Sequence, residues 1–522
     1  MSEVVLRKTN QILHSFPILG AVLAALALLV SGCLVGPDFQ PPHPEAPANW
    51  EGVTKMPTKQ PYVITAQPAE LTQWWRQFDD PRLTGLVEEA IKANLDLQLA
   101  KARLRQARAL RGVAVGGLWP TITVTSTFQR EKTQVVTQGG SSKVAPKTAQ
   151  VENLYQAGFD AVWEIDLFGG VRRNLEAANA NVEAAIENIN DVLVTLVSEV
   201  GLNYIQLRGF QQEIVIAKNN LKAQQDTATI TRQRSGVGFL SALDVANAEG
   251  NVATTEATIP VFENSAQQAI YALSVLLARP PADLLEQLAP SRNLPSVPSE
   301  IPAGLPSNLL RRRPDIREAE AQLHAATAQI GVATAQLFPQ FSLTGTMNWQ
   351  SNLLQTWWGA AGNSYSFGPT LTWPIFQGGA LISNVRVQEA LRDQAFITYQ
   401  KTVLTAFQDV ENAMIAFNKE QQHRKSLNES VIANRKAVEL SVELYTMGLL
   451  DFLNVLVAQR SLYTAEDALV VSETNIVTDL LALYKALGGG WEFVPSEAQT
   501  SEAQTTSSTP TISYSAIKQN IK

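Results

Sequence analysis

The chain has 522 residues, of which 17% are charged and 45% hydrophobic, and its formal net charge is −7. This modest acidity, without a long basic block, argues against a nucleic-acid partner, and the single cysteine excludes a disulfide framework. Size alone allows two or three domains.

Residues 1–32 have the pattern of an export signal. Arg7 and Lys8 precede an apolar run over residues 18–30, which is shorter than the ~20 residues of a membrane-spanning helix. Small residues then lead to the only cysteine, Cys33, as in a bacterial lipoprotein signal. We expect cleavage before Cys33 and acylation there by groups such as palmitate; the alternative is an ordinary secretory signal with a chance cysteine. Leu34 rather than Asp follows, which favours the outer membrane by the sorting rules of lipoproteins.

Residues 33–70 contain eight prolines and are expected to be extended chain without helix. After this segment the sequence repeats itself. Residues 94–114 and 313–333 share Asp, Ala and Leu positions and a final Gly-Val-Ala at an offset of 219. Such a period is far too long for a solenoid. It predicts a duplicated half-protein, with residues 71–290 as the first structural repeat and 291–490 as the second.

Each repeat contains two segments in which apolar and polar residues alternate, which predicts strands. They cover about 120–131, 153–166, 340–350 and 364–375. Their length and terminal aromatic residues are typical of transmembrane β-strands, and three tryptophans are assigned to the aromatic girdle: Trp163, Trp349 and Trp373. A soluble sandwich edge would also alternate.

Four strands cannot close a barrel, and an open edge in lipid would leave backbone groups unpaired. The chain is therefore expected to oligomerise. Two copies would supply eight strands and three would supply twelve. The small polar residues on the inward face favour three copies, hence a homotrimer around a lumen.

The remainder is predicted to be helix. Residues 380–487 contain no proline and one glycine, Gly448. The pattern predicts a long helix, a turn at that glycine, and an antiparallel return, as in a coiled coil. The first repeat predicts the same around Gly238, with a kink at Pro260. The tail, 491–522, is rich in Thr and Ser and is expected to be disordered.

Several motifs together resemble a known family. Gly304-Leu305-Pro306-Ser307 is followed by Arg311-Arg312-Arg313-Pro314-Asp315-Ile316, and Trp163-Glu164-Ile165-Asp166-Leu167-Phe168-Gly169 precedes the first long helix. The chain resembles the outer-membrane factors, which are TolC-like efflux ducts, and in particular the lipoprotein branch that serves RND-type pumps.

This resemblance implies a trimeric α-helical barrel of long antiparallel coiled coils in the periplasm, continuous with a twelve-stranded transmembrane β-barrel. It also implies a periplasmic adaptor that contacts the tips of the helices, and an RND-type pump in the inner membrane. Six residues are assigned to these tips: Gly238, Ser241, Asp244, Gly448, Asp451 and Asn454. Helix N-capping explains Ser241 and Asp244 equally well, and both roles can coexist.

The periplasmic gate is assigned to Leu453, Val457 and Arg460. The family often has an acidic residue where this chain has Val457, so the usual ion pair to Arg460 is missing. Asp451 and Glu443 are alternative partners that the sequence does not rank. We expect the closed mouth to rely more on apolar packing.

No catalytic constellation, cofactor motif or metal-ligand spacing is found, since the four histidines are scattered. The predicted function is a passive exit duct of a tripartite efflux system for small amphiphilic compounds or drugs, in the outer membrane of a Gram-negative bacterium. The alternatives are an exit duct for type I protein secretion or heavy-metal efflux, and a non-conducting envelope-bridging lipoprotein.

Overall fold

The computed structural model describes residues 34–51, 63–65, 71–135, 148–298, 300–302, 304–357, 359 and 362–493. The predicted signal, Cys33 and almost all of the predicted tail lie outside these ranges.

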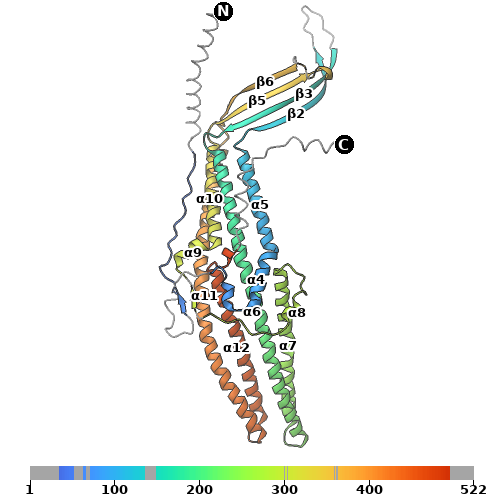
Figure 1. Cartoon of the computed structure of the whole chain (residues 1–522), viewed down its shortest axis with the longest axis vertical. Coiled ribbons are helices and arrows are strands. Elements are labelled where there is room, and N and C mark those ends of the chain that lie inside the picture. The colour runs from blue at the N-terminus through green and yellow to red at the C-terminus, as the bar shows by residue number, and fades with distance from the viewer. Residues whose placement is uncertain are drawn as a thin grey trace, which may run out of the picture. The chain divides into compact units, whose positions relative to one another are not determined.

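Helix predominates, and equivalent helices of the two repeats have equal lengths (Figure 1). The pairs have 22, 67 and 35 residues: α5 (Leu95–Gly116) with α10 (Pro314–Ala335), α6 (Gly170–Gly236) with α11 (Ala380–Thr446), and α7 (Ala242–Leu276) with α12 (Phe452–Ala486). A 67-residue helix is about 100 Å long. Helix α7 continues through Pro260. The duplication is therefore a structural duplication as well as a sequence repeat.

Four strands form one antiparallel sheet in the order β2-β3-β5-β6, and Figure 1 shows them side by side. Their bounds are β2 (Thr121–Val135), β3 (Thr148–Ile165), β5 (Gln340–Ser351) and β6 (Asn363–Thr372). The helices match in length between the repeats but the strands do not, so the extra residues of the first repeat lie in its strands and the connection between them.

Shorter elements complete the chain. They are β1 (Val63–Thr65), which pairs in parallel with β4 (Glu300–Pro302), η1 (Trp74–Phe78), α4 (Pro81–Ala93), α8 (Leu285–Leu288), α9 (Pro306–Arg312), η2 (Leu354–Thr356) and η4 (Trp491–Phe493). Asp80 caps α4 by accepting from the amides of Arg82 and Leu83, and the Tyr204 hydroxyl donates to its second oxygen at 2.6 Å.

The arginine-rich motif before α10 ties three helices together. The Arg313 guanidinium donates to Asp315 at 2.7 Å and to Asp409 of α11 at 3.1 Å. It also donates to the carbonyl oxygen of Ala486 at the end of α12. The motif therefore acts as a structural junction.

The chain divides into two compact units, and neither is one of the repeats. The first unit combines 1–44, 102–186 and 318–401 and holds the four-stranded sheet. The second combines 45–101, 187–317 and 402–522 and holds the ends of the long helices. Each unit takes segments from both repeats. In the first unit the hairpin β2–β3 of one repeat and the hairpin β5–β6 of the other meet through the pairing of β3 with β5.

None of the helices in the described ranges combines the length and the apolar character that a membrane-spanning helix requires.

Candidate functional site

The first helix tip is the turn between α6 and α7. Gly238 has φ 84°, a conformation that glycine adopts without strain. Ser241 and Asp244 form a reciprocal capping box: the Ser241 hydroxyl accepts from the Asp244 amide at 3.3 Å, and the Asp244 carboxylate accepts from the Ser241 amide at 3.2 Å. The capping role predicted for both residues is confirmed.

The second tip, between α11 and α12, has the same turn with different side-chain chemistry. Gly448 has φ 78°. Asp451 is the N-cap of α12 but its carboxylate makes no capping hydrogen bond, and both Asp451 and Asn454 are exposed. The polar groups of this tip are therefore not used to hold the helix.

Both tips present apolar side chains at equivalent positions. We call these six side chains the tip knobs, and they are 61–80% exposed. They form three pairs at an offset of 210: Val237 with Met447, Phe239 with Leu449, and Leu243 with Leu453. Large exposed apolar groups that recur in register mark a surface suited to a partner.

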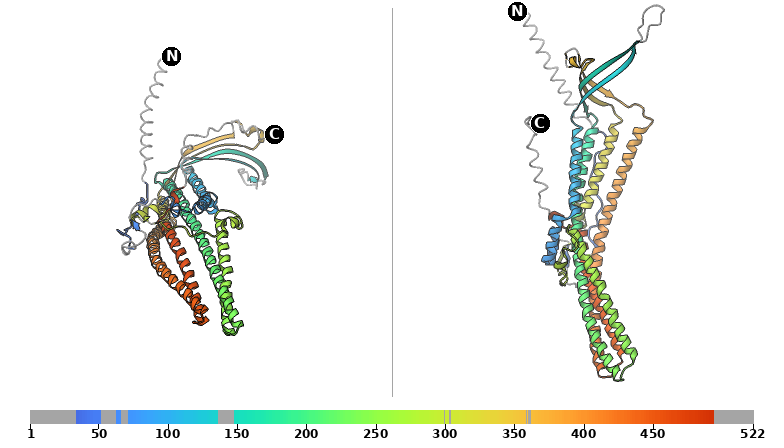
Figure 2. Two further views of the ribbon diagram at one scale, coloured as in Figure 1. Left: turned by 60° about the horizontal axis from the view of Figure 1, so that its bottom comes forward. Right: turned by 90° about the vertical axis from the view of Figure 1, so that its right-hand side faces the viewer.

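The two tips contact each other through buried side chains, and two further views show that both hairpins end at the same end of the long helices (Figure 2). Ala228, Ala248, Tyr445, Phe452, Val455 and Leu456 form a buried apolar cluster between the hairpins. Nearer the turns, the Arg234 guanidinium donates to the carbonyl oxygens of Tyr445 and Thr446 and lies over the Tyr445 ring. The hairpins of the two repeats therefore form one body at this end.

The three residues assigned to the gate from sequence lie on the exposed face of α12. Arg460 donates from Nε to the Asn251 amide oxygen of α7 at 3.0 Å, so its partner is a neutral amide rather than Asp451 or Glu443. Leu453 and Val457 are 61% and 56% exposed. More than half of each side chain is therefore uncovered in the protomer, and full apolar packing of these residues would need another copy of the chain.

The sheet has one apolar and one polar face. Residues directly opposite each other share a face. One row across the four strands is apolar: Val124, Phe159, Met347 and Tyr365. The adjacent row is polar: Thr123, Asp160, Thr346 and Ser366. The pattern matches the alternation predicted from sequence.

The girdle tryptophans lie toward the two ends of the strands. The Trp163 indole donates to the Leu118 carbonyl at 3.0 Å, and the Trp373 indole donates to the Leu337 carbonyl at 3.1 Å. Trp349 lies further along β5, where its ring meets Phe159 edge-on at 6.3 Å. The sheet therefore has indoles toward both ends.

Two carboxyls, one buried and one partly buried, lie on the helices and were not indicated by the sequence. Glu213 of α6 is 8% exposed, and one of its carboxyl oxygens has no hydrogen-bond partner in the described chain. Burial, and then the neighbouring Asp467, raise its pKa to about 7. Burial, and then Glu420, raise the pKa of Asp479 to about 6. Both groups change charge near neutral pH.

Comparison with known proteins identifies the family model that matches. The model described as "Outer membrane efflux protein" matches residues 86–279 and 305–489. The two matches start 219 residues apart and end 210 apart, which are the two offsets of the internal repeat.

Relatives match along almost the whole chain. Nodulation protein T of Rhizobium leguminosarum bv. viciae is 33% identical over 493 residues, covering 94% of this chain and 97% of its own. The probable efflux pump outer membrane protein TtgC of Pseudomonas putida is 31% identical over 473 residues, covering 90% and 95%. The solved outer-membrane channel OprN is 35% identical with a TM-score of 0.80, covering 88% of this chain and 100% of its own.

Proposed function

Because the chain belongs to the outer membrane efflux protein family, whose members are channels rather than enzymes, we propose that it is the passive exit duct of a tripartite efflux system. The inner-membrane pump, of the RND type, supplies the energy. The cargo is a set of small amphiphilic compounds or drugs, and the duct contributes to multidrug resistance.

The observation that carries this proposal is the two-faced sheet with two open edges. The outer edges of β2 and β6 pair with no other strand in the described chain. In lipid, such edges would leave N–H and C=O groups without partners at several kcal/mol each. Three copies would close twelve strands into a barrel, with the apolar row facing lipid and the polar row lining a lumen.

The helix tips support a partner in the periplasm. Each protomer has two similar tips, so a trimer has six, and each presents three tip knobs beside exposed polar groups. A periplasmic adaptor could contact all six in equivalent ways. The adaptor-contacting residues are then Gly238, Ser241, Asp244, Gly448, Asp451 and Asn454, and Leu453, Val457 and Arg460 form the gate.

The signal pattern supports placement in the outer membrane of a Gram-negative bacterium. Acylation of Cys33 would add lipid anchoring to the barrel, since several acyl chains hold a protein firmly where one does not. In this arrangement Trp163, Trp349 and Trp373 form the interfacial girdle.

Reconstitution into planar lipid bilayers tests the duct. Purified protein of trimeric mass should give discrete conductance steps. Folded trimers that give no channel events would reject the duct and favour the non-conducting bridging lipoprotein.

Deletion of the gene tests the cargo. Loss of resistance to a panel of amphiphilic drugs, restored by the intact gene, supports drug efflux; sensitivity to metal ions alone would favour the heavy-metal alternative. The relative TtgC is named as part of an efflux pump. This name supports the efflux duct proposed here over the alternative of a protein-secretion duct.

A further inference from the structure

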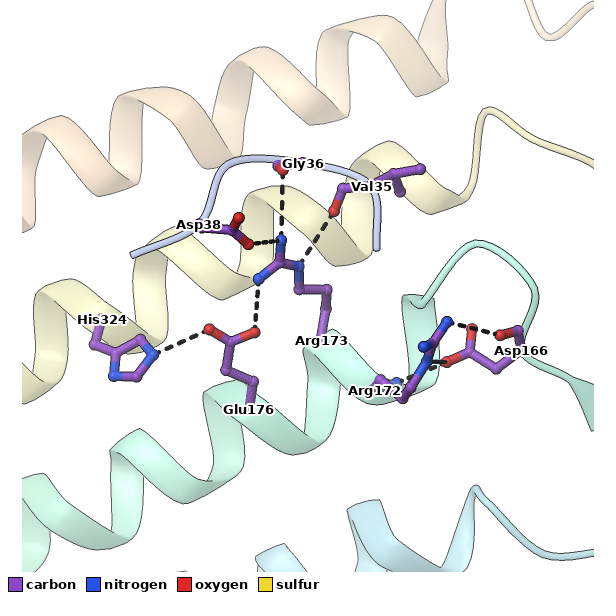
Figure 3. Close-up of polar contacts among 8 residues, drawn as sticks. All are labelled: Val35, Gly36, Asp38, Asp166, Arg172, Arg173, Glu176 and His324. Atoms are coloured by element: carbon purple, nitrogen blue, oxygen red, sulfur yellow. Dashed lines mark hydrogen bonds and ion pairs between the residues drawn. The ribbon is translucent and has the colours of Figure 1, made fainter. Parts of the chain in front are cut away.

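A buried arginine holds the first described residues of the chain (Figure 3). Arg173, in the first turn of α6, has a side chain that is 3% exposed. Its guanidinium donates to the Val35 carbonyl at 3.2 Å, the Gly36 carbonyl at 3.4 Å and the Asp38 carboxylate at 2.6 Å. We call residues 34–39 the strap. Three of the four acceptors on Arg173 belong to it, and the fourth is Glu176 at 2.8 Å.

The strap also contacts the second repeat, through His324 of α10. The second oxygen of Glu176 lies 3.0 Å from Nε2 of His324 in α10. The His324 ring stacks on Phe39 of the strap, with centroids 4.3 Å apart. The contacts run from α6 to α10 and return through the strap to Arg173.

Glycines allow the strap to lie against the helices. A Cβ on Gly36 would stand 2.5 Å from the Cα of Gly331 in α10, and a Cβ on Gly331 would stand 2.7 Å from the Arg173 side chain. Upstream, a Cβ on Gly169 would meet Leu34 at 3.2 Å, and the Val35 amide donates to the Phe168 carbonyl. The strap therefore occupies a slot shaped for one peptide in one register.

Within the described residues, the second repeat lacks an equivalent of this slot. The residues at the repeat positions of Arg173 and Glu176 are Ser383 and Arg386. Gly112, which corresponds to Gly331, has open space where a Cβ would stand. The duplication alone therefore does not explain why an arginine stands at position 173. Its hydrogen-bond partners indicate that it serves to hold the N-terminal segment.

We propose that Arg173 is the positioning residue for the lipid anchor. Its hydrogen bonds to the strap hold Val35, two residues after Cys33, against the first turn of α6. This inference rests on the lipid anchoring proposed above. The Val35 amide donates to the Phe168 carbonyl in the turn from β3 into α6, so the seated strap lies beside the end of β3 at which Trp163 lies. The proposed acyl chains would then belong to this end of the sheet.

Arg111 of α5 supplies a matched control. Its guanidinium Nε donates to the Asn179 side-chain oxygen of α6 at 2.7 Å. Removing its charge should loosen a contact between α5 and α6 and leave the strap seated.

Chymotrypsin treatment of detergent-solubilised trimers of the full chain measures seating of the strap. Cleavage after Leu34 or Phe39 requires the strap to leave its slot, and the N-terminal fragment can be followed by mass spectrometry. We expect Arg173→Gln to release it at least ~10-fold faster than wild type, because a buried charged hydrogen-bond network is removed. Arg111→Gln should release it at the wild-type rate.

Asp38→Asn tests the same contact from the strap, at an exposed residue that does not threaten folding, and should also accelerate release. Wild-type release from folded Asp38→Asn and Arg173→Gln trimers would overturn the proposal, and if Arg173→Gln does not fold, Asp38→Asn decides alone. The mass of the fragment reports separately on the anchor. A fragment without acyl groups would reject the lipidation itself and with it the positioning role, whatever the release rates.

Discussion

Trp163 and Trp373, which are 210 residues apart, make the same hydrogen bond. Each indole donates to the backbone carbonyl of a leucine that follows a 22-residue helix, Leu118 in one repeat and Leu337 in the other. The contact joins the end of a strand to the end of the helix before it, so the repeat reproduces a junction and not only its elements.

Replacing either tryptophan with phenylalanine should therefore have the same effect. Trp163→Phe and Trp373→Phe each keep an aromatic ring and lose one hydrogen bond, which we expect to lower stability by about 1 kcal/mol. Thermal dissociation of the detergent-solubilised oligomer measures the change. Trp119→Phe is the control, because the Trp119 indole is 69% exposed and has no hydrogen bond to the described residues. An equal loss of stability in this variant would mean that the smaller ring, and not the missing hydrogen bond, causes the effect.

A carboxylate at Val457 should change ion conduction. The side chain is 56% exposed on the face assigned to the gate, and a trimer of Val457→Asp would carry three added negative charges around the lumen. We expect greater cation selectivity that weakens as salt rises, measured from reversal potentials in a KCl gradient.

Val471→Asp provides the comparison for that experiment. Val471 is 41% exposed on the same helix, about 21 Å further along, and should change selectivity less. If Val457→Asp conducts like wild type at every salt concentration, Val457 is not part of the gate.

The buried carboxyl of Glu213 should make stability fall as pH rises. Burial and Asp467 raise its pKa to about 7 in the folded chain, from an ordinary value of 4.5. Between these values the folded state holds a proton that the unfolded state has released, so stability declines from about pH 4.5 to pH 7 and is then level. Glu213→Gln should flatten this decline and raise stability at pH 8 by up to roughly 3 kcal/mol per protomer.

Unfolding temperatures from pH 5 to pH 8 measure the effect. Glu263→Gln, which removes an exposed carboxylate paired with Lys218 on the same helix pair, should keep the wild-type slope. A Glu213→Gln variant with an unchanged slope would mean that the carboxyl is ionised in the folded protein throughout this range.

The two tips should separate stability from partner binding. Ser241→Ala removes half of a capping box and should destabilise the first hairpin by about 1 kcal/mol. Asp451→Ala removes a carboxylate that caps nothing and should leave stability unchanged while weakening adaptor binding. Calorimetry and binding to the purified adaptor give the two readings; equal adaptor affinity for wild type and Asp451→Ala would remove that residue from the interface.

The periodicity of apolar residues was sufficient to predict the long helices and the four strands of the sheet. The helix-turn-helix around Gly448 and the strand from Gln340 follow from local patterns, because the 3.6- and 2-residue periods are strong over long segments. The two faces of the sheet follow from the same alternation once the register is known.

Contacts between distant segments could not be predicted in this way. The pairing of Arg460 with Asn251 joins helices 209 residues apart in sequence, and an asparagine within an amphipathic helix gives no local signal. Glu213 resembles the exposed glutamates around it, since burial depends on which helix packs against it. The resemblance to a family suggested the tips, but only the structure shows that Ser241 caps its helix and Asp451 does not.

The slot for the strap makes the order of the two halves in the sequence matter. A protein made of two similar halves could, on the pattern of its helices alone, be encoded with either half first. The strap removes that equivalence, because its contacts need Arg173 from the first half and His324 with Gly331 from the second, and its own residues precede both halves in the sequence. A circularly permuted gene beginning at residue 291 would keep every long helix and strand and still lose one feature that tells the first half from the second.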